Sequence, residues 1–167
     1  DRRRRDCAGV VGMIQISLPC GSLALVDDDD ADLVLDKSWH AYHKSNTSYV
    51  CTTIAGQTVY LHRLLLSPPD GLQVDHIDGD GLNNRRSNLR LATGSQNVAA
   101  QRRIPAHGYR GVCKRGEKWR AEIGWGSRRT RGPTRSTKIE AARDYDRIAL
   151  QKYGEFAQLN FPAEGGQ

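Results

Sequence analysis

The amino-acid sequence predicts an α+β fold that is divided between two small cores. The 167 residues are 38% hydrophobic and 7% aromatic, a composition that suits two small cores better than one large core. Short apolar runs with an alternating pattern dominate residues 13–61 and predict strands. Capping boxes that begin at Thr93 and at Thr137 predict two helices further along the chain.

The charge is distributed unevenly between the two parts. Residues 1–98 hold 10 Lys+Arg against 12 Asp+Glu, a net charge of −2, whereas residues 99–167 hold 15 against 7, a net charge of +8. This asymmetry is expected when one module of a protein binds nucleic acid. A basic face that meets only solvent is the alternative.

The first twelve residues, DRRRRDCAGVVG, contain four consecutive arginines, which repel one another. We expect residues 1–12 to be either a disordered basic arm or a non-native extension that precedes a natural start at Met13. No run of 18 apolar residues exists, which argues against a membrane span, and no signal peptide is recognisable. The four cysteines form no CxxC pair, which argues against structural zinc and favours a reducing compartment.

The segment 13–58 is predicted to be a β-rich scaffold. Residues 13–18 and 23–26 form two apolar runs of strand type, and residues 49–61 are typical of a hairpin. The four consecutive acids Asp27–Asp30 are expected to be solvated in a loop, because adjacent like charges rarely form a site.

Residues 72–97 carry the most informative pattern. A brief strand at 72–74 delivers Asp75 and His76 at its end, a loop rich in Gly and Asn follows, and residues 88–91 form a return strand. The capping box at Thr93 then starts a helix with Asn97 on its first turn. The local plan is strand, loop, strand, helix.

These residue types fit the hydrolysis of a phosphodiester with one metal ion. The Asp75 carboxylate and the Asn97 amide oxygen are ligands for magnesium or manganese, which keeps several waters and also binds phosphate oxygens. The imidazole of His76 is suited to accept the proton of the attacking water at neutral pH. An amide oxygen of Asn88 is expected to hold the other ring nitrogen. Asn83 and Asn84 are interpreted as turn formers.

The Asp-His pair with Asn88 and Asn97, the preceding LHRLLL and the following NNRRSNLRLAT together resemble the HNH nuclease family, in the Asn-ended branch of phage and intron homing endonucleases. The resemblance implies a ββα-metal core with His76 as general base, Asp75 and Asn97 as metal ligands and Asn88 as the residue that orients the site. It also implies DNA contacts, for which the candidates in this part are His62, Arg63, Arg85 and Arg86.

A second module is predicted from about Gly108. Residues 109–112 and 118–123 form two strands around a turn, and a helix runs from Thr137 through Lys152 to a stop at Gly154. The motifs YRGV, KWRAEI, EAARDYDRIAL and LNFP resemble the APETALA/ethylene-response-factor DNA-binding domain, which lays a three-stranded antiparallel sheet, packed on one helix, in the major groove. The third strand, at 131–135, is expected to be short or irregular.

This second resemblance implies which side chains face DNA. Arg110, Arg115 and Glu122 match the groove-facing positions of that family, and Arg120 and Trp125 are added on charge and position. Guanidinium groups suit guanine edges and phosphates.

The sequence therefore predicts a basic arm (1–12), a β-rich scaffold with an HNH nuclease (13–101) and a DNA-binding domain (108–162), joined by a linker with Arg102 and Arg103. The expected function is a magnesium-dependent homing-type endonuclease that acts on double-stranded DNA in the cytoplasm of a bacterial host and is encoded by a phage or mobile element. A DNA-binding regulator with a vestigial nuclease site is the alternative, and an RNA-binding protein is a third, disfavoured possibility. Both a monomer and a homodimer fit the sequence.

Overall fold

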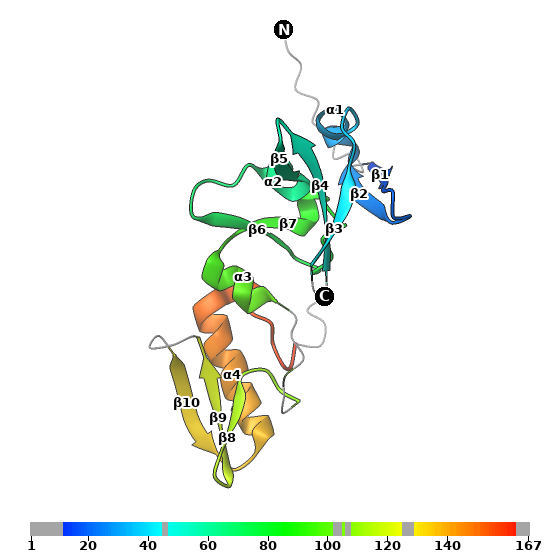
Figure 1. Cartoon of the computed structure of the whole chain (residues 1–167). Helices are drawn as coiled ribbons and strands as arrows, with labels where there is room; N and C mark the ends of the chain where they lie inside the picture. The colour runs from blue at the N-terminus through cyan, green and yellow to red at the C-terminus, as the bar shows by residue number, and fades with distance from the viewer. Residues whose placement is uncertain (1–11, 45–46, 102–104, 106–107, 125–128, 163–167) are drawn as a thin grey trace. The chain divides into compact units, whose positions relative to one another are not determined.

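The computed structural model of the chain describes residues 12–44, 47–101, 105, 108–124 and 129–162. The chain divides at the Ala92–Thr93 bond into two compact units, unit 1 before it and unit 2 after it. Each unit is described by itself (Figure 1).

The described part of unit 1 contains three small sheets. Antiparallel pairing joins the first two strands, and the next three form an antiparallel sheet in the order β3–β4–β5. The third sheet pairs β6 with β7. The strands are β1 (Met13–Ser17), β2 (Leu23–Asp27), β3 (His40–Lys44), β4 (Thr47–Ile54), β5 (Gln57–Tyr60), β6 (Leu72–His76) and β7 (Leu89–Thr93).

One apolar core holds these sheets together. Its side chains come from β2, β4, β6 and β7 and from two short helices, α1 (Ala31–Val34) and α2 (Leu61–Leu66). In β2 the alternation of strand side chains places Ala24 and Val26 in this core. The fully buried members include Val26, Val50 and Leu61.

Helix α2 delivers the chain from β5 to β6. It ends at Leu66, and the capping residue Ser67 takes up a left-handed φ of 42° and donates its backbone N–H to the Arg63 carbonyl at 2.8 Å. Pro68 and Pro69 follow and cannot continue a helix. The chain then turns into β6, which ends at the Asp-His pair.

Unit 2 contains a three-stranded antiparallel sheet in the order β10–β9–β8, with helix α4 packed against it. Its core is formed by Ala121 and Ile123 of β9 with Tyr145 and Ala149 of α4. Gly111 has a φ of 63°, and a Cβ there would lie 2.2 Å from the Tyr145 ring, so a glycine is required. The elements are α3 (Gly94–Ala100), β8 (Val112–Arg115), β9 (Lys118–Ile123), β10 (Thr130–Arg135) and α4 (Lys138–Tyr153).

The predicted α+β fold is confirmed, with small antiparallel sheets and few helices. Both capping boxes are present and start α3 after Thr93 and α4 after Thr137. Strand β10 is irregular as predicted, because its register shifts between Arg131 and Thr134 around Pro133, which has no N–H to donate. The predicted arm up to residue 11, the linker residues Arg102 and Arg103, and Trp125 lie outside the described residues.

Candidate active site

The end of β6 brings two buried polar side chains together. Asp75 and His76 are each 8% exposed, although both side chains carry polar groups. Arg90, on the paired strand β7, donates from Nε and Nη2 to Oδ2 of Asp75, both at 2.9 Å. A buried carboxylate normally needs such a partner, and these two bonds from Arg90 hold the Asp75 side chain in place.

An aromatic cluster surrounds the His76 ring. The His62 ring lies 5.1 Å from it, edge to face, and the Tyr49 ring lies 6.0 Å from it. The Tyr60 ring stacks on the His62 ring, with 5.6 Å between the two ring centroids. The cluster is brought together by β4, β5, α2 and β6. The His62 and Tyr49 rings therefore restrict the rotation of the His76 side chain.

Burial sets the charge of these imidazoles. It lowers the pKa of His76 below the ordinary value, because the charged form is costly in a site with little water. The hydrogen bond that His76 makes to Oδ1 of Asn84 and the nearby acids Asp78 and Asp75 oppose this effect. Burial and the neighbouring His76 lower the pKa of His62 to about 3. At neutral pH both rings are uncharged, which is the form a general base requires.

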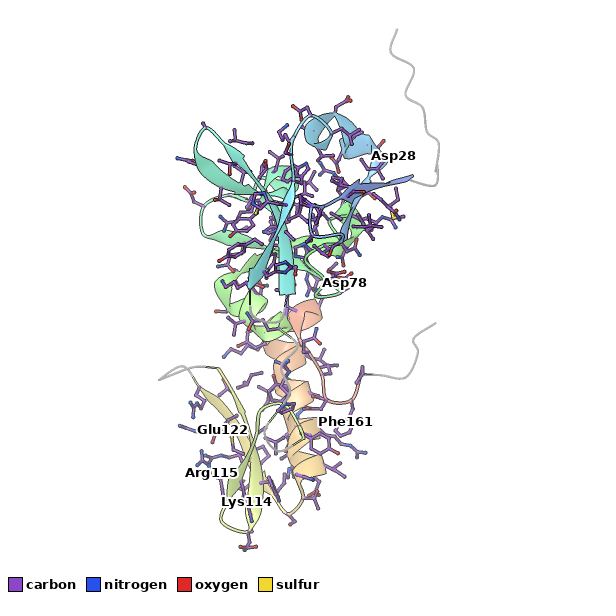
Figure 2. The ribbon with its side chains drawn as sticks, turned by 45° about the vertical axis from the view of Figure 1, so that its right-hand side comes forward. Asp28, Asp78, Lys114, Arg115, Glu122 and Phe161 are labelled. Carbon is purple, nitrogen blue, oxygen red and sulfur yellow. The ribbon has the colours of Figure 1, made fainter. Side chains whose placement is uncertain are left out.

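The amide of Asn88 closes the loop after β6 rather than holding His76. Its Oδ1 accepts from the Asp78 N–H at 3.0 Å, and its Nδ2 donates to Asp78 Oδ1 at 2.9 Å and to the Asn83 carbonyl at 2.8 Å. These bonds occupy both amide groups of the side chain. The structure thus gives Asn88 a different place from the predicted one: it clamps the loop that carries Asp78, which Figure 2 labels.

The residue that reaches His76 is Asn84, for which the sequence predicted only the role of a turn former. Asn84 is fully buried, and its Oδ1 lies 3.4 Å from Nε2 of His76. The signal for it was weak, because asparagines cluster in ordinary turns. A buried position for one of them could not be read from the loop alone.

The N-terminal hairpin holds this loop by its backbone. Leu25 of β2 donates its N–H to the Leu82 carbonyl at 2.9 Å and accepts from the Asn84 N–H at 2.8 Å. A parallel bridge joins Leu25 and Asn83. The predicted scaffold is thus in direct contact with the candidate active-site loop.

Two ion pairs reinforce the same contact. Asp27 accepts from Arg85 Nε at 2.9 Å and from the Arg86 N–H at 2.8 Å, and Asp30 accepts from Arg86 Nε and Nη2 at 2.9 and 2.7 Å. Both carboxylates are buried. The expectation of a solvated acidic run is therefore wrong for Asp27 and Asp30. Arg85 and Arg86, predicted to contact DNA, are paired with these carboxylates, while their side chains stay 36% and 47% exposed.

The remaining predicted residues of the nuclease part lie in different environments. His62 is 7% exposed, and its Nδ1 has no hydrogen-bond partner within the described structure. Its ring lies against that of His76, and little of its surface is open for the predicted DNA contact. Arg63 is exposed on α2. Asn97 lies on α3 and is partly buried in unit 2.

Asp75 offers one oxygen ligand of the type that a hard divalent cation takes. Among the described residues, no cluster of three or more His, Cys, Asp or Glu side chains gathers to hold a metal. Magnesium does not need one, because it is commonly bound by one or two carboxylates, substrate phosphates and water. Asp75 supplies one such carboxylate, and its pairing with Arg90 through Oδ2 is the feature that a cation would have to share.

In unit 2, one glutamate gathers three arginines on the sheet. Glu122 accepts from Arg115 at 2.6 Å and from Arg120 and Arg129 at 3.0 Å. Its pKa falls to about 2, mainly through the bond from Arg115 and then that from Arg120. Side chains alternate along β9, so Glu122 lies on the face opposite Ala121 and Ile123, which face α4 (Figure 2).

Arg110 departs from this pattern. Its Nη2 donates to the Gln101 carbonyl just after α3, and its backbone N–H donates to Asn160 Oδ1 at 2.5 Å. The guanidinium of Arg110, predicted to face a DNA groove, is bonded within unit 2. The arginines that Glu122 holds on this face are Arg115, Arg120 and Arg129, and Arg129 was not among the predicted DNA-binding residues.

Comparison with known proteins gives two matches. A family model described as HNH endonuclease matches residues 67–99, which contain β6, the loop, β7 and most of α3. The chain is also 30% identical over 147 residues to an uncharacterized HNH endonuclease of Acanthamoeba polyphaga mimivirus, a match that covers 84% of this chain and 75% of the viral protein. No solved structure matches the chain. In the described residues, no helix is long and apolar enough to cross a membrane.

Proposed function

The chain belongs to the HNH endonuclease family, and from this premise we propose that it is a metal-dependent endonuclease of the homing type that cuts double-stranded DNA. The observation that carries the proposal is the buried pair at the end of β6. A carboxylate and a neutral imidazole follow one another there, the first held by Arg90 and the second enclosed by rings.

His76 is the general base of this proposal. As the water oxygen bonds to phosphorus, the phosphorus bond to the leaving sugar oxygen breaks and the water proton passes to the imidazole. The lowered pKa of His76 keeps the ring able to accept that proton at neutral pH. Since a general base contributes about 10²–10⁴-fold to a rate, its loss should abolish most of the activity.

Asp75 and Asn97 are the proposed ligands of a magnesium or manganese ion. The role of Asn97 rests on the spacing in the sequence, and that of Asp75 also on its place beside His76. When bound, the ion would offset the charge that develops on the phosphate and the leaving oxygen. Arg90 orients the Asp75 carboxylate for this purpose.

The proposed DNA-reading part is unit 2. The resemblance to the APETALA/ethylene-response-factor domain supports it, as does the face on which Glu122 holds Arg115, Arg120 and Arg129. Arginines pre-oriented by a carboxylate lose little entropy when they bind phosphates or guanine edges. Domain limits of 13–101 and 108–162 remain our prediction. The viral relative fits the predicted phage or mobile-element origin.

A nicking assay tests the proposal. Supercoiled plasmid would be incubated with the full chain in magnesium or manganese, with and without a chelator, and the ends mapped by sequencing. We expect nicked or linear product from the wild type and almost none from His76→Ala. His43→Ala is the matched control, because His43 is an exposed histidine of β3 that bonds only to Ser48 Oγ among the described contacts. Equal cleavage by wild type and His76→Ala would refute His76 as the base.

A DNA-binding regulator with a vestigial site is the second candidate. One observation favours it: Arg90 already occupies Oδ2 of Asp75, where the cation is proposed to bind. The same assay separates the two functions. DNA binding by a wild type that cuts no DNA under any metal condition would support the regulator and refute the nuclease.

A further inference from the structure

We propose that Asn84 is the residue that positions the general base: it accepts a hydrogen bond from Nε2–H of His76 and so leaves Nδ1 as the nitrogen that takes the proton from water. This inference rests on the proposed role of His76. It differs from the role for Asn88 implied by the family resemblance. It also assigns a function to a residue expected to shape a turn.

The orientation of the Asn84 amide follows from its other bonds. Its Nδ2 lies 3.3 Å from the Gly81 carbonyl and 3.1 Å from the Leu82 carbonyl. Both carbonyls only accept hydrogen bonds, so the NH₂ group must face them. The carbonyl oxygen Oδ1 then faces His76, because it is the other end of the same amide.

The amide orientation fixes the imidazole proton. Oδ1 of Asn84 cannot donate, so a hydrogen bond to Nε2 of His76 requires the proton to be on Nε2. In a neutral ring the second nitrogen, Nδ1, then carries the lone pair. The separation of 3.4 Å is longer than the usual range of about 2.7–3.2 Å. Such bonds in catalytic sites often shorten only when the substrate binds.

Neither partner can easily turn away. Asn84 is 0% exposed, and its backbone N–H donates to the Leu25 carbonyl at 2.8 Å. The His76 ring is flanked by His62 and Tyr49. A rotated amide would turn Oδ1 toward the Gly81 and Leu82 carbonyls, which only accept hydrogen bonds, and would remove the donor to the Gly81 carbonyl.

Asn88 is not a competitor for this role. Its Oδ1 and Nδ2 are bonded to the Asp78 and Asn83 groups of the loop. Asn88 therefore closes the loop, and Asn84 connects the loop to His76.

The test observes the ring proton of His76 by nitrogen-15 NMR in the full chain, without DNA, at about pH 8, where a histidine of ordinary pKa near 6.5 is neutral. The expected wild-type result is a proton on Nε2 that exchanges slowly with water. A proton on Nδ1 overturns the proposal. This readout needs no cleavage, so it stands apart from a failure of the nuclease function.

Two variants then separate positioning from folding. Asn84→Ala removes the acceptor, and the Nε2–H signal should shift and exchange rapidly. Asn84→Asp keeps an oxygen toward Nε2 of His76, so the Nε2–H signal of His76 should stay protected from exchange. The variant loses the donor to the Gly81 and Leu82 carbonyls, so the stability of the protein should fall. An Nε2–H signal that is unchanged in Asn84→Ala overturns the proposal.

Kinetics supply the second readout, with Asn83→Ala as the matched control in the same loop. For Asn84→Ala we expect kcat to fall by about tenfold or more, while KM stays within about twofold. The fall in kcat should not exceed the whole contribution of a general base, which is about 10²–10⁴-fold. Asn84→Asp should recover part of the loss. A lower kcat in Asn83→Ala equal to that of Asn84→Ala would assign the effect to the loop as a whole and refute a specific role for Asn84.

Discussion

Gly81→Ala should disturb the candidate active site through lack of space. A Cβ at this position would lie 2.2 Å from the Ser48 carbonyl oxygen and 2.9 Å from Cδ1 of Tyr49. Ordinary contacts begin at 3.4 Å, so the carbonyl or the loop has to move by more than about 1 Å. The nearest atom belongs to the backbone of β4, which cannot rotate away.

The expected cost follows from this displacement. Overpacking a tight contact costs about 1–3 kcal/mol. For a unit of this size that corresponds to a fall in Tm of about 4–8 °C for each kcal/mol. The loop also carries Asn84, whose Nδ2 bonds to the Gly81 carbonyl itself. A shift of about 1 Å at a catalytic group can reduce a rate by about 10²-fold.

The assay compares thermal unfolding and plasmid cleavage of the wild type, Gly81→Ala and Gly94→Ala. Gly94 is the matched control, because a Cβ there meets nothing within 4 Å and it starts helix α3. We expect Gly94→Ala to be neutral or to raise stability by about 0.4–1 kcal/mol, since alanine restricts the unfolded chain. A Gly81→Ala protein with the stability and activity of Gly94→Ala would refute the close packing of the loop on β4.

Two further predictions concern charge. Glu122→Gln should lower the unfolding free energy of unit 2 by about 1–2 kcal/mol, a value reduced by the solvent around arginines that are 27–51% exposed. Since its pKa of about 2 lies below the ordinary 4.5, the pairing is complete above pH 4.5 and is lost as the pH falls toward 2; urea unfolding at several pH values should show the gap between wild type and variant narrowing below pH 4.5, and a gap that widens there would contradict it. Asp30→Asn should destabilise unit 1 by about 1–2 kcal/mol, because it weakens the charge-assisted bonds from Arg86 to a carboxylate that is 3% exposed; the exposed Asp32→Asn serves as control, and equal effects of the two would count against the clamp.

Local signals in the sequence predicted much of the fold. The capping boxes at Thr93 and Thr137 located the starts of α3 and α4, because each involves only four adjacent residues. The same holds for the order strand, loop, strand, helix around Asp75 and His76. Turn residues and short apolar runs are sufficient for such features, since their partners lie nearby in the chain.

Contacts over long separations in the sequence were missed. Arg85 and Arg86 have the composition of a DNA contact, but their partners Asp27 and Asp30 lie 56 to 59 residues earlier. Within the loop sequence, Asn84 has the features of a turn former. Its burial depends on a backbone hydrogen bond to Leu25 of a separate hairpin, which the loop sequence does not reveal. No pattern within the loop sequence indicates these distant partners. The contacts of Arg85, Arg86 and Asn84 therefore became visible only in the three-dimensional structure.

The clamp of the N-terminal hairpin on the loop also affects how the protein folds. Joining segments separated by nearly sixty residues costs about 3–4 kcal/mol of chain entropy plus a constant, and this cost precedes the gain from the contacts. We therefore expect the loop around Asn84 to order after the intervening strands and α2, which a delayed protection of its amides in hydrogen exchange would show. A chain in which the hairpin has come loose would keep Asp75 and His76 in its sequence but lose the ordered loop, so cutting should be confined to fully folded molecules.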